Sequence, residues 1–327
     1  MKKLVSLFTS QLTESLKIGK YLKFNKSKLP IHNVVIMGMG GSGISGIIVS
    51  KLVSNESHIP IIICNDYSIP FFVNENTLFI VSSYSGNTEE TIIAFKEAII
   101  KKAQIVCITS GGKINEISEE HNIDKIIIPG GMPPRSCLSY IFVQLIFILF
   151  NFGIISKKIL EEIENAINLI NLEESNIQIR AKEFALNLKG KFPVIYSTSE
   201  SEGIAIRFKQ QLNENSKMLC WHNVIPEMNH NELVGWTTPN NNLSVIFLRN
   251  ENDFDRNIKR INITKKLISQ YTGCIFDMFS KGENRTEQLL YNIHLIDWIS
   301  VELAEIKNVD VNEVNVIDFL KLELLKN

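Results

Sequence analysis

Short apolar runs recur along the first half of the chain, each followed by a turn and a helix-sized segment. The runs are Val34–Met37, Pro60–Cys64, Leu78–Val81, Ile105–Thr109 and Ile126–Pro129. They lack the polar alternation of a half-exposed strand, so we expect both of their faces to be buried. Buried strands separated by helices indicate a parallel sheet that is covered on both faces.

The same pattern returns in the second half of the chain. Two further apolar runs read as strands, Pro193–Ser197 and Leu243–Leu248, and helices are expected at 201–213 and 258–271. Between the halves, the charged stretch 157–191 predicts one or two exposed helices that join two domains.

The length of 327 residues leaves room for two ordinary domains, each with its own core. We predict an α/β protein made of two three-layer α/β/α sandwiches with mainly parallel sheets. The expected segments are an N-terminal helix over 1–20, a first domain over 21–153, and a second domain over 154–327 that ends in helices.

Composition argues against several classes of partner and compartment. The formal net charge of -1 gives no general attraction to nucleic acid or to an anionic membrane. The five cysteines are odd in number, widely spaced and without a C-x-x-C pair, so we expect a reducing, cytoplasmic location and no zinc ribbon. The start of the chain is apolar too briefly for a signal peptide and predicts a surface-docked helix.

One stretch, Tyr140–Ile155, is apolar enough to raise the question of a membrane span. It is shorter than the ~20 residues that a spanning helix requires. Gln144 and Asn151 also interrupt it. We therefore predict a helix buried in the protein core.

The segment Ser82–Thr91, with the sequence SSYSGNTEET, carries the clearest chemical signal. It follows the apolar run that ends at Val81 and precedes an expected helix. Hydroxyls, backbone N–H groups and the positive end of a helix dipole together suit a phosphate. No lysine lies in this serine turn, so we predict that it holds a phosphorylated ligand by its inert end without transferring the phosphate.

A glycine turn, Gly38–Gly43 with the sequence GMGGSG, follows the run Val34–Met37. Its G-x-G-x-x-G spacing matches a dinucleotide fingerprint, and Asp66 is a loose match to the acidic residue that binds the ribose. The serine turn has no place in that interpretation. Both turns make sense together if they close around one phosphorylated sugar from adjacent strand ends of one sheet.

The glycine turn and the serine turn together resemble the sugar isomerase (SIS) domain. Four later segments resemble one branch of it, the bifunctional phosphoglucose/phosphomannose isomerase family: Pro133–Ser136, Asn213–Lys217, Pro226–Glu232 and Ile317–Lys321. The resemblance covers the chain in the expected order from about residue 20 to 327. It implies two flavodoxin-like SIS domains, a homodimer, no metal and no cofactor. It also implies aldose–ketose isomerisation of a hexose 6-phosphate, in glycolysis and gluconeogenesis.

The resemblance also implies a set of site residues, carried over position by position. The phosphate would be held by Gly41, Ser42, Ser83, Ser85 and Thr88. The chemistry would be carried by Arg135, Glu214, His230 and Lys321, with His230 donated across the dimer interface.

These residue types suit the expected reaction. Converting glucose 6-phosphate to fructose 6-phosphate moves a proton between C2 and C1 through an enediol, and Glu214, between a helix and a loop, suits the base. Arg135 would stabilise the enediolate with a permanent charge, and the two prolines before it stiffen its approach. His230 suits the proton transfers of ring opening. Lys321 lies in an apolar stretch, and the alternative to a catalytic role is that its side chain only extends to solvent.

Mannose 6-phosphate differs from glucose 6-phosphate at C2 and shares its enediol, so one tolerant pocket can serve both sugars. The family often has Thr-Pro shortly before the lysine, where this chain has Asn312 and Glu313. This departure bears on the mannose 6-phosphate activity, so the glucose 6-phosphate activity is the firmer expectation.

Other functions stay open at this point. SIS domains also serve in non-catalytic sugar-phosphate sensors, although no basic helix-turn-helix segment is visible here. An SIS aminosugar-phosphate isomerase or lyase would use the same turns with a different base. A metal site on His222 and His230 with Glu227 or Glu232 matches no established ligand spacing.

Overall fold

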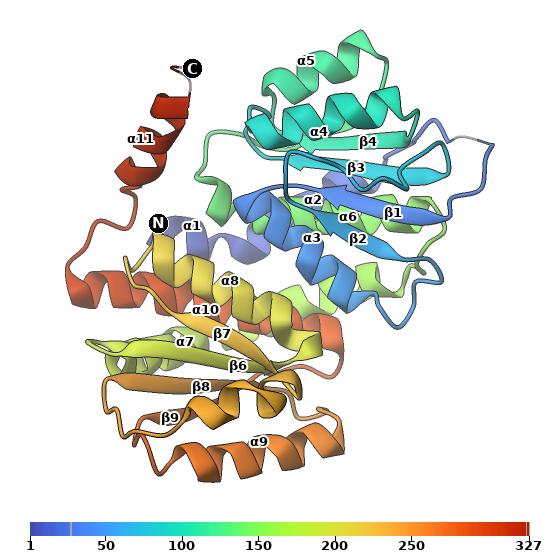
Figure 1. Ribbon diagram of the computed structural model, residues 1–327. Coiled ribbons are helices and arrows are strands. Elements are labelled where there is room, and N and C mark those ends of the chain that lie inside the picture. Colours follow the sequence, from blue (N-terminus) through green and yellow to red (C-terminus); the bar gives the residue numbers. More distant parts are fainter. Residues whose placement is uncertain (27, 325, 327) are drawn as a thin grey trace. The chain divides into compact units, whose positions relative to one another are not determined.

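The computed structural model describes residues 1–26, 28–324 and 326. The chain divides into two compact units (Figure 1). The N-terminal unit comprises residues 6–171 and 282–290, and the C-terminal unit comprises residues 1–5, 172–281 and 291–327.

The N-terminal unit is built on a parallel sheet with the strand order β2-β1-β3-β4-β5. Its strands are β1 (Asn33–Met37), β2 (Ile61–Cys64), β3 (Thr77–Ser83), β4 (Gln104–Thr109) and β5 (Asp124–Ile127). Its helices are α2 (Phe8–Gly19), α3 (Gly40–Leu52), α4 (Glu89–Ile100), α5 (Gly112–Glu120), the 3-10 turn η1 (Pro134–Ser136), α6 (Leu138–Asn151) and the first parts of α7 (Lys158–Leu188) and α10 (Arg285–Lys307).

Helices cover both faces of this sheet (Figure 1). On one face, side chains such as Phe79 and Cys107 pack against Phe95 of α4 and Ile114 of α5. Helices α3 and α6 pack together on the other face, and α2 packs against α6. Every residue of β3 is buried, which explains why its sequence shows no polar alternation.

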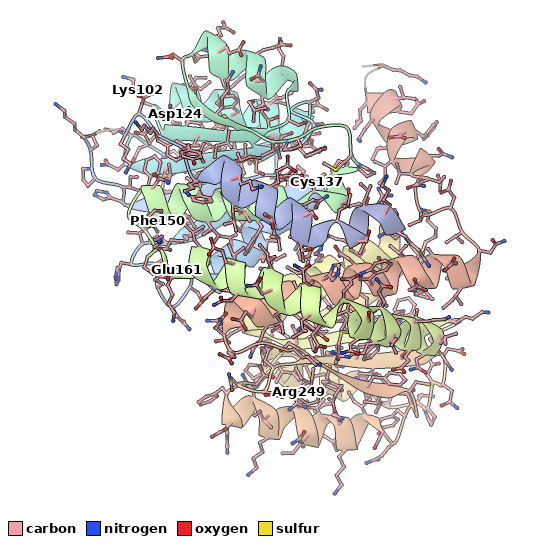
Figure 2. The ribbon with its side chains drawn as sticks, turned by 180° about the vertical axis from the view of Figure 1, so that it is seen from behind. Lys102, Asp124, Cys137, Phe150, Glu161 and Arg249 are labelled. Carbon is pink, nitrogen blue, oxygen red and sulfur yellow. The ribbon has the colours of Figure 1, made fainter. Side chains whose placement is uncertain are left out.

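Helix α6 covers the predicted apolar stretch from Tyr140 as far as Asn151, and the prediction of a buried helix is confirmed there. Cys137 and Phe150 mark its two ends in Figure 2. Its only buried amide side chain, Gln144, donates to the backbone carbonyl of Ser15 at 2.8 Å. Within the described ranges, no helix is both long and apolar enough to cross a membrane.

The C-terminal unit repeats the topology, with a parallel sheet in the order β7-β6-β8-β9. Its strands are β6 (Phe192–Thr198), β7 (Trp221–Ile225), β8 (Leu243–Arg249) and β9 (Ile275–Phe279). Its helices are α1 (Lys2–Ser6), η2 (Ser199–Ser201), α8 (Glu202–Glu214), η3 (Glu227–His230), η4 (Glu232–Gly235), α9 (Asp255–Ile268), α11 (Asn315–Leu324) and the later parts of α7 and α10.

Helix α9 covers one face of this second sheet, where Tyr196 and Phe247 pack with Ile261 and Ile268. Helix α8 covers the other face beside α10 (Figure 1). The buried guanidinium of Arg207 on α8 pairs with Asp297 on α10 at 2.5 Å. The predicted α/β class with parallel sheets is confirmed.

Strands β7 and β9 were not among the predicted elements. Both lie at sheet edges, where most of their residues are partly exposed. The charged stretch 157–191 holds one helix, α7, whose buried stripe includes Ile163, Ile170 and Ile177.

Candidate active site

The glycine turn and the serine turn leave neighbouring strands at the same edge of the N-terminal sheet. Strands β1 and β3 pair in parallel with Met37 opposite Val81, so both turns begin at the same level. The chain crosses from β1 to β2 on one side and from β3 to β4 on the other. The gap between β1 and β3 is therefore the switch point at which open α/β sheets bind ligands. The predicted adjacency of the two turns is confirmed.

Glycines let the first turn fold tightly and pack against a neighbouring segment. A Cβ on Gly43 would lie 2.5 Å from the carbonyl oxygen of Gly38. A Cβ on Gly41 would lie 3.0 Å from the carbonyl oxygen of Pro134. Gly41 thus allows a close backbone approach, and the backbone that approaches belongs to η1, which carries Arg135.

The predicted phosphate-binding hydroxyls gather around this junction. The Ser42 hydroxyl accepts the backbone N–H of Tyr84 at 3.1 Å, which ties the glycine turn to the serine turn. The hydroxyl oxygens of Ser83 and Thr88 lie 3.1 Å apart, and the exposed Ser85 hydroxyl accepts the N–H of Asn87 at 3.2 Å. A hydroxyl that accepts one bond keeps its hydrogen for another acceptor.

The start of helix α4 adds backbone donors to this cluster. Thr88 occupies the N-cap position, but its side chain makes no capping hydrogen bond. The first N–H groups of a helix have no partner within the helix and sit at the positive end of its dipole. Glu89 and Glu90 lie in the first turn, and their negative charges offset the positive end of the dipole. An anion at this position would therefore be bound mainly by hydrogen bonds from the hydroxyls and the N–H groups.

A third turn, Ser110–Lys113 after β4, braces the serine turn and was not assigned a role from sequence. The Ser110 hydroxyl donates to the Tyr84 carbonyl at 2.7 Å, and the Lys113 N–H donates to the Asn87 side chain at 3.0 Å. Gly86, at φ +68, approaches the carbonyl of Gly111 so closely that a Cβ would lie 1.8 Å away. The sequence signal that could have indicated this turn is Ser110 with Gly111 and Gly112, directly after the strand.

Tyr84 links the serine turn to the segment that carries Arg135. Its phenol oxygen accepts the N–H of Met132 at 3.1 Å, and burial raises the pKa of Tyr84, so the phenol stays protonated. Arg135 itself is only 6% exposed within η1. The structure therefore brings the backbone of Arg135 next to the glycine turn and buries its side chain.

Glu214 is the last residue of α8, whereas the expected helix ended at Asn213, and the turn after it is held by hydrogen bonds on two sides. The Asn215 amide and the Ser216 hydroxyl donate to Ser300 of α10 at 2.9 and 2.6 Å. The Lys217 ammonium donates to the carbonyls of Glu214 at 2.6 Å and Glu313 at 2.7 Å. Lys217 thus joins the end of α8 to the segment that leads into α11.

His230 and Lys321 lie on exposed parts of the C-terminal unit. His230 ends η3, and its ring makes no hydrogen bond within the part of the chain that the structure describes. Lys321 lies on α11, a helix none of whose described residues is buried. The roles predicted for these two residues stay predictions.

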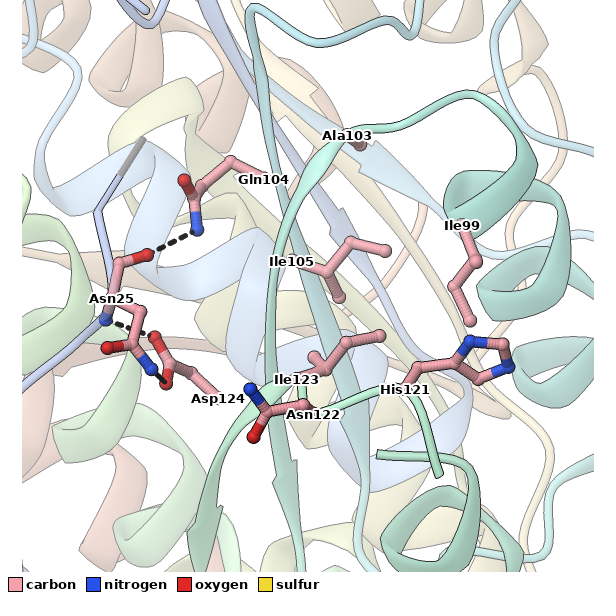
Figure 3. Close-up of a pocket in the computed structure, with 9 residues that line it drawn as sticks. All are labelled: Asn25, Ile99, Ala103, Gln104, Ile105, His121, Asn122, Ile123 and Asp124. Atoms are coloured by element: carbon pink, nitrogen blue, oxygen red, sulfur yellow. Dashed lines mark hydrogen bonds between the residues drawn. The ribbon is translucent and has the colours of Figure 1, made fainter. Parts of the chain in front are cut away.

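A cavity of about 260 Å³ opens at the opposite edge of the N-terminal sheet (Figure 3). Its lining comprises Asn25, Ile99, Ala103, Gln104, Ile105, His121, Asn122, Ile123 and Asp124. The cavity lies at the amino ends of β4 and β5, whereas the hydroxyl-bearing turns follow carboxyl ends of strands. It is therefore separate from the candidate active site.

Comparison with known proteins agrees with this geometry. The family described as "Bacterial phospho-glucose isomerase C-terminal SIS domain" matches residues 177–324. The fold is shared with the C-terminal domain of glucosamine-fructose-6-phosphate aminotransferase from Francisella tularensis, with a TM-score of 0.79 at 13% identity over 96% of this chain and 98% of that one. Two parallel sheets, the first with hydroxyl-bearing turns at its switch point, together with the family match define a protein of the SIS class.

Closer relatives narrow the class to one family. A bifunctional phosphoglucose/phosphomannose isomerase from Caldicellulosiruptor bescii is 38% identical over 96% of each chain. A D-glucosamine-6-phosphate 4-epimerase from Sulfolobus acidocaldarius is 34% identical, over 62% of this chain and 63% of its own. The chain belongs to the bifunctional phosphoglucose/phosphomannose isomerase family.

Proposed function

We propose that this protein is an isomerase that interconverts glucose 6-phosphate and fructose 6-phosphate, and also accepts mannose 6-phosphate. One observation carries the proposal: the glycine turn and the serine turn meet at the β1/β3 switch point, joined by the bond from Tyr84 to Ser42. The relative from Caldicellulosiruptor bescii, which bears these activities in its name, supports the choice of substrate.

The phosphate half of the site lies in the N-terminal unit. The hydroxyls of Ser42, Ser83, Ser85 and Thr88 donate to the phosphate oxygens, and Gly41 keeps the first turn close to η1. The start of α4 adds N–H groups to the same anion. A phosphate held in this way leaves the carbon skeleton of the sugar free for proton transfer.

The proton-transfer half rests on Glu214 and Arg135. Glu214 removes the proton from C2 and returns it to C1, which requires a carboxylate held in one position. The fastened turn at Asn215 to Lys217 supports this role. Arg135 stabilises the negative charge of the enediolate, and its burial supports that role because electrostatic stabilisation is stronger away from water.

His230 and Lys321 complete the proposed machinery. His230 opens the sugar ring by moving protons at O5 and O1, and Lys321 adds a second positive charge near the reacting carbons. We propose that the protein is a homodimer in which His230 serves the partner's site, and the exposure of its ring supports this. The two SIS domains are proposed to span 21–153 and 154–327, and the location to be cytoplasmic.

The test is an assay of fructose 6-phosphate formation from glucose 6-phosphate and from mannose 6-phosphate, each with and without a chelator. The proposal expects both substrates to be converted at rates that the chelator leaves unchanged. Binding of the sugar phosphates without turnover would favour a sensor and contradict the proposal.

The epimerase relative gives a specific reason to include glucosamine 6-phosphate in the same assay. That protein's name assigns it chemistry on an aminosugar phosphate, and it is 34% identical to this chain over 62% of this chain's length. Faster turnover of glucosamine 6-phosphate than of either hexose 6-phosphate would favour the aminosugar function.

A further inference from the structure

His230 lies on a loop whose position is set by contacts on either side of it. Before it, the Asn229 amide donates to the Thr264 hydroxyl of α9 at 2.9 Å, and Met228 is fully buried. After it, the chain reaches Glu232 at the start of η4. The exposed imidazole is thus presented from a short segment between two anchors.

The second anchor is the carboxylate of Glu232, which accepts three hydrogen bonds from neutral donors. Its Oε1 accepts the Tyr196 hydroxyl at 2.5 Å and the Trp221 indole N–H at 3.2 Å. Its Oε2 accepts the Asn223 side-chain amide at 2.6 Å. These donors come from strands β6 and β7, so Glu232 fastens the His230 loop to the edge of the sheet.

This hydrogen-bond network requires both side-chain oxygens of Glu232 to act as acceptors. The Asn223 Oδ1 accepts the N–H of Val224 at 2.7 Å, so this amide cannot turn round without losing that bond. The Tyr196 oxygen already accepts the indole N–H of Trp236 at 3.2 Å, which directs its own hydrogen toward Glu232. A glutamine at 232 would place an NH₂ group against at least one of these donors in either orientation. Only the carboxylate satisfies all three.

We propose that Glu232 is a positioning residue that holds the His230 imidazole in its working orientation. Glu232 acts through the loop and does not contact the reacting atoms. The proposal rests on the proposed function, because it assumes that His230 takes part in isomerisation. Misplacement of a reacting group by about 1 Å can lower a rate by up to ~10²-fold, so a loosened loop has a measurable consequence.

A double-mutant cycle with Glu232→Gln and His230→Ala tests the proposal in the glucose 6-phosphate assay. Glu232→Gln alone should lower kcat about tenfold or more while KM changes less than about twofold, because the phosphate contacts are untouched. In the His230→Ala background, adding Glu232→Gln should change kcat by less than about twofold. Equal losses with and without His230 would overturn the proposal, as would full activity of Glu232→Gln.

Glu227→Gln is the matched control. Glu227 lies on the same loop. Among the described residues, its carboxylate accepts one side-chain hydrogen bond, from the Asn231 amide at 2.8 Å, which the amide oxygen of glutamine can also accept. Its substitution removes the same charge and should leave kcat within about twofold of the wild type. Where Glu232→Gln fails to fold, Tyr196→Phe removes one donor and enters the same cycle.

A second readout separates this proposal from the proposed function. The ring C–H signal of His230 in an NMR spectrum is identified by its absence in His230→Ala. Glu232→Gln should shift and broaden this signal, and Glu227→Gln should leave it in place. An unmoved signal in Glu232→Gln would overturn the positioning role. A wild-type protein without isomerase activity would contradict the proposed function, and the NMR comparison would still decide the role of Glu232.

Discussion

The hydroxyl oxygen of Ser42 accepts the backbone N–H of Tyr84 at 3.1 Å, across 42 positions in the chain. This bond joins the glycine turn after β1 to the serine turn after β3. It leaves the Ser42 hydrogen for a phosphate oxygen while fixing where that hydrogen can point. One side chain thus joins the two turns of the candidate phosphate site and, in the proposed function, also donates to the phosphate.

Ser42→Ala should weaken the binding of hexose 6-phosphates and of inorganic phosphate. The variant loses a donor to the anion and leaves the buried Tyr84 N–H without its partner, which together predict about a tenfold or larger rise in KM. Ser50→Ala, which removes a hydroxyl bonded to Ile47 further along α3, is the control. Equal KM values for the two variants would contradict a phosphate role for Ser42.

Gly41→Ala should lower kcat by displacing the segment that carries Arg135. The added methyl group would lie 3.0 Å from the Pro134 carbonyl oxygen, so the backbone of η1 must move away. Such crowding costs about 1–3 kcal/mol in stability, and the shift of Arg135 should lower kcat about tenfold. Gly130→Ala is the control, because its methyl group would meet Ser110 at an ordinary 3.4 Å. Unchanged kinetics in Gly41→Ala would show that this contact does not position Arg135.

Lys217→Met should loosen the turn after Glu214. The Lys217 ammonium holds the carbonyls of Glu214 and Glu313, and Lys217→Met leaves both without this donor. Hydrogen bonds to charged groups contribute about 1.5–3 kcal/mol, and we expect a loss of about 2 kcal/mol in the free energy of unfolding. Urea denaturation measures the loss, and Lys266→Met on the exposed face of α9 is the control. A variant as stable as its control would contradict the assigned role.

Stability should fall in acid partly through Glu174. Burial raises the pKa of this carboxyl, but hydrogen bonds from His294, Gln178 and Trp298 outweigh burial and hold the pKa below its ordinary value. The stabilisation is therefore fully present above about pH 4.5, the ordinary value, and is lost as the pH falls through the lower folded-state pKa.

Urea midpoints measured from pH 6 to pH 3 check this sign. Glu174→Gln should show a shallower decline in acid than the wild type, because the variant no longer has this proton to bind. Glu164→Gln, on an exposed part of the same helix, should follow the wild type. A Glu174→Gln curve parallel to the wild type would show that the carboxyl does not contribute.

The strands that the sequence predicted well are those buried on both faces. Residues of β3 must all be apolar or small because helices cover both sides, so the run is visible without any structure. Edge strands are different. Strand β7 contains Trp221, His222 and Asn223, none of which is fully buried, and Trp221 and Asn223 donate hydrogen bonds to Glu232. Such a strand resembles a loop in sequence, and only its pairing with β6 defines it.

In the candidate site, too, some features could be predicted from the sequence and others could not. The hydroxyls and glycines of the two turns were predictable because their chemistry is concentrated in short segments. The contacts that hold them were not, because Tyr84 reaches Met132 over 48 positions and Ser110 reaches Tyr84 over 26. These bonds depend on the order of strands in the sheet, which the apolar runs do not reveal.

Proton transfer by Glu214 is the central claim, and isomerisation in deuterium oxide tests it most directly. The wild-type protein should convert glucose 6-phosphate to fructose 6-phosphate and place solvent deuterium at C1, because the base exchanges its proton with water. Glu214→Gln should lower this rate by ~10²-fold or more while still binding the sugar phosphate. Undiminished conversion and deuterium incorporation by Glu214→Gln would contradict the account.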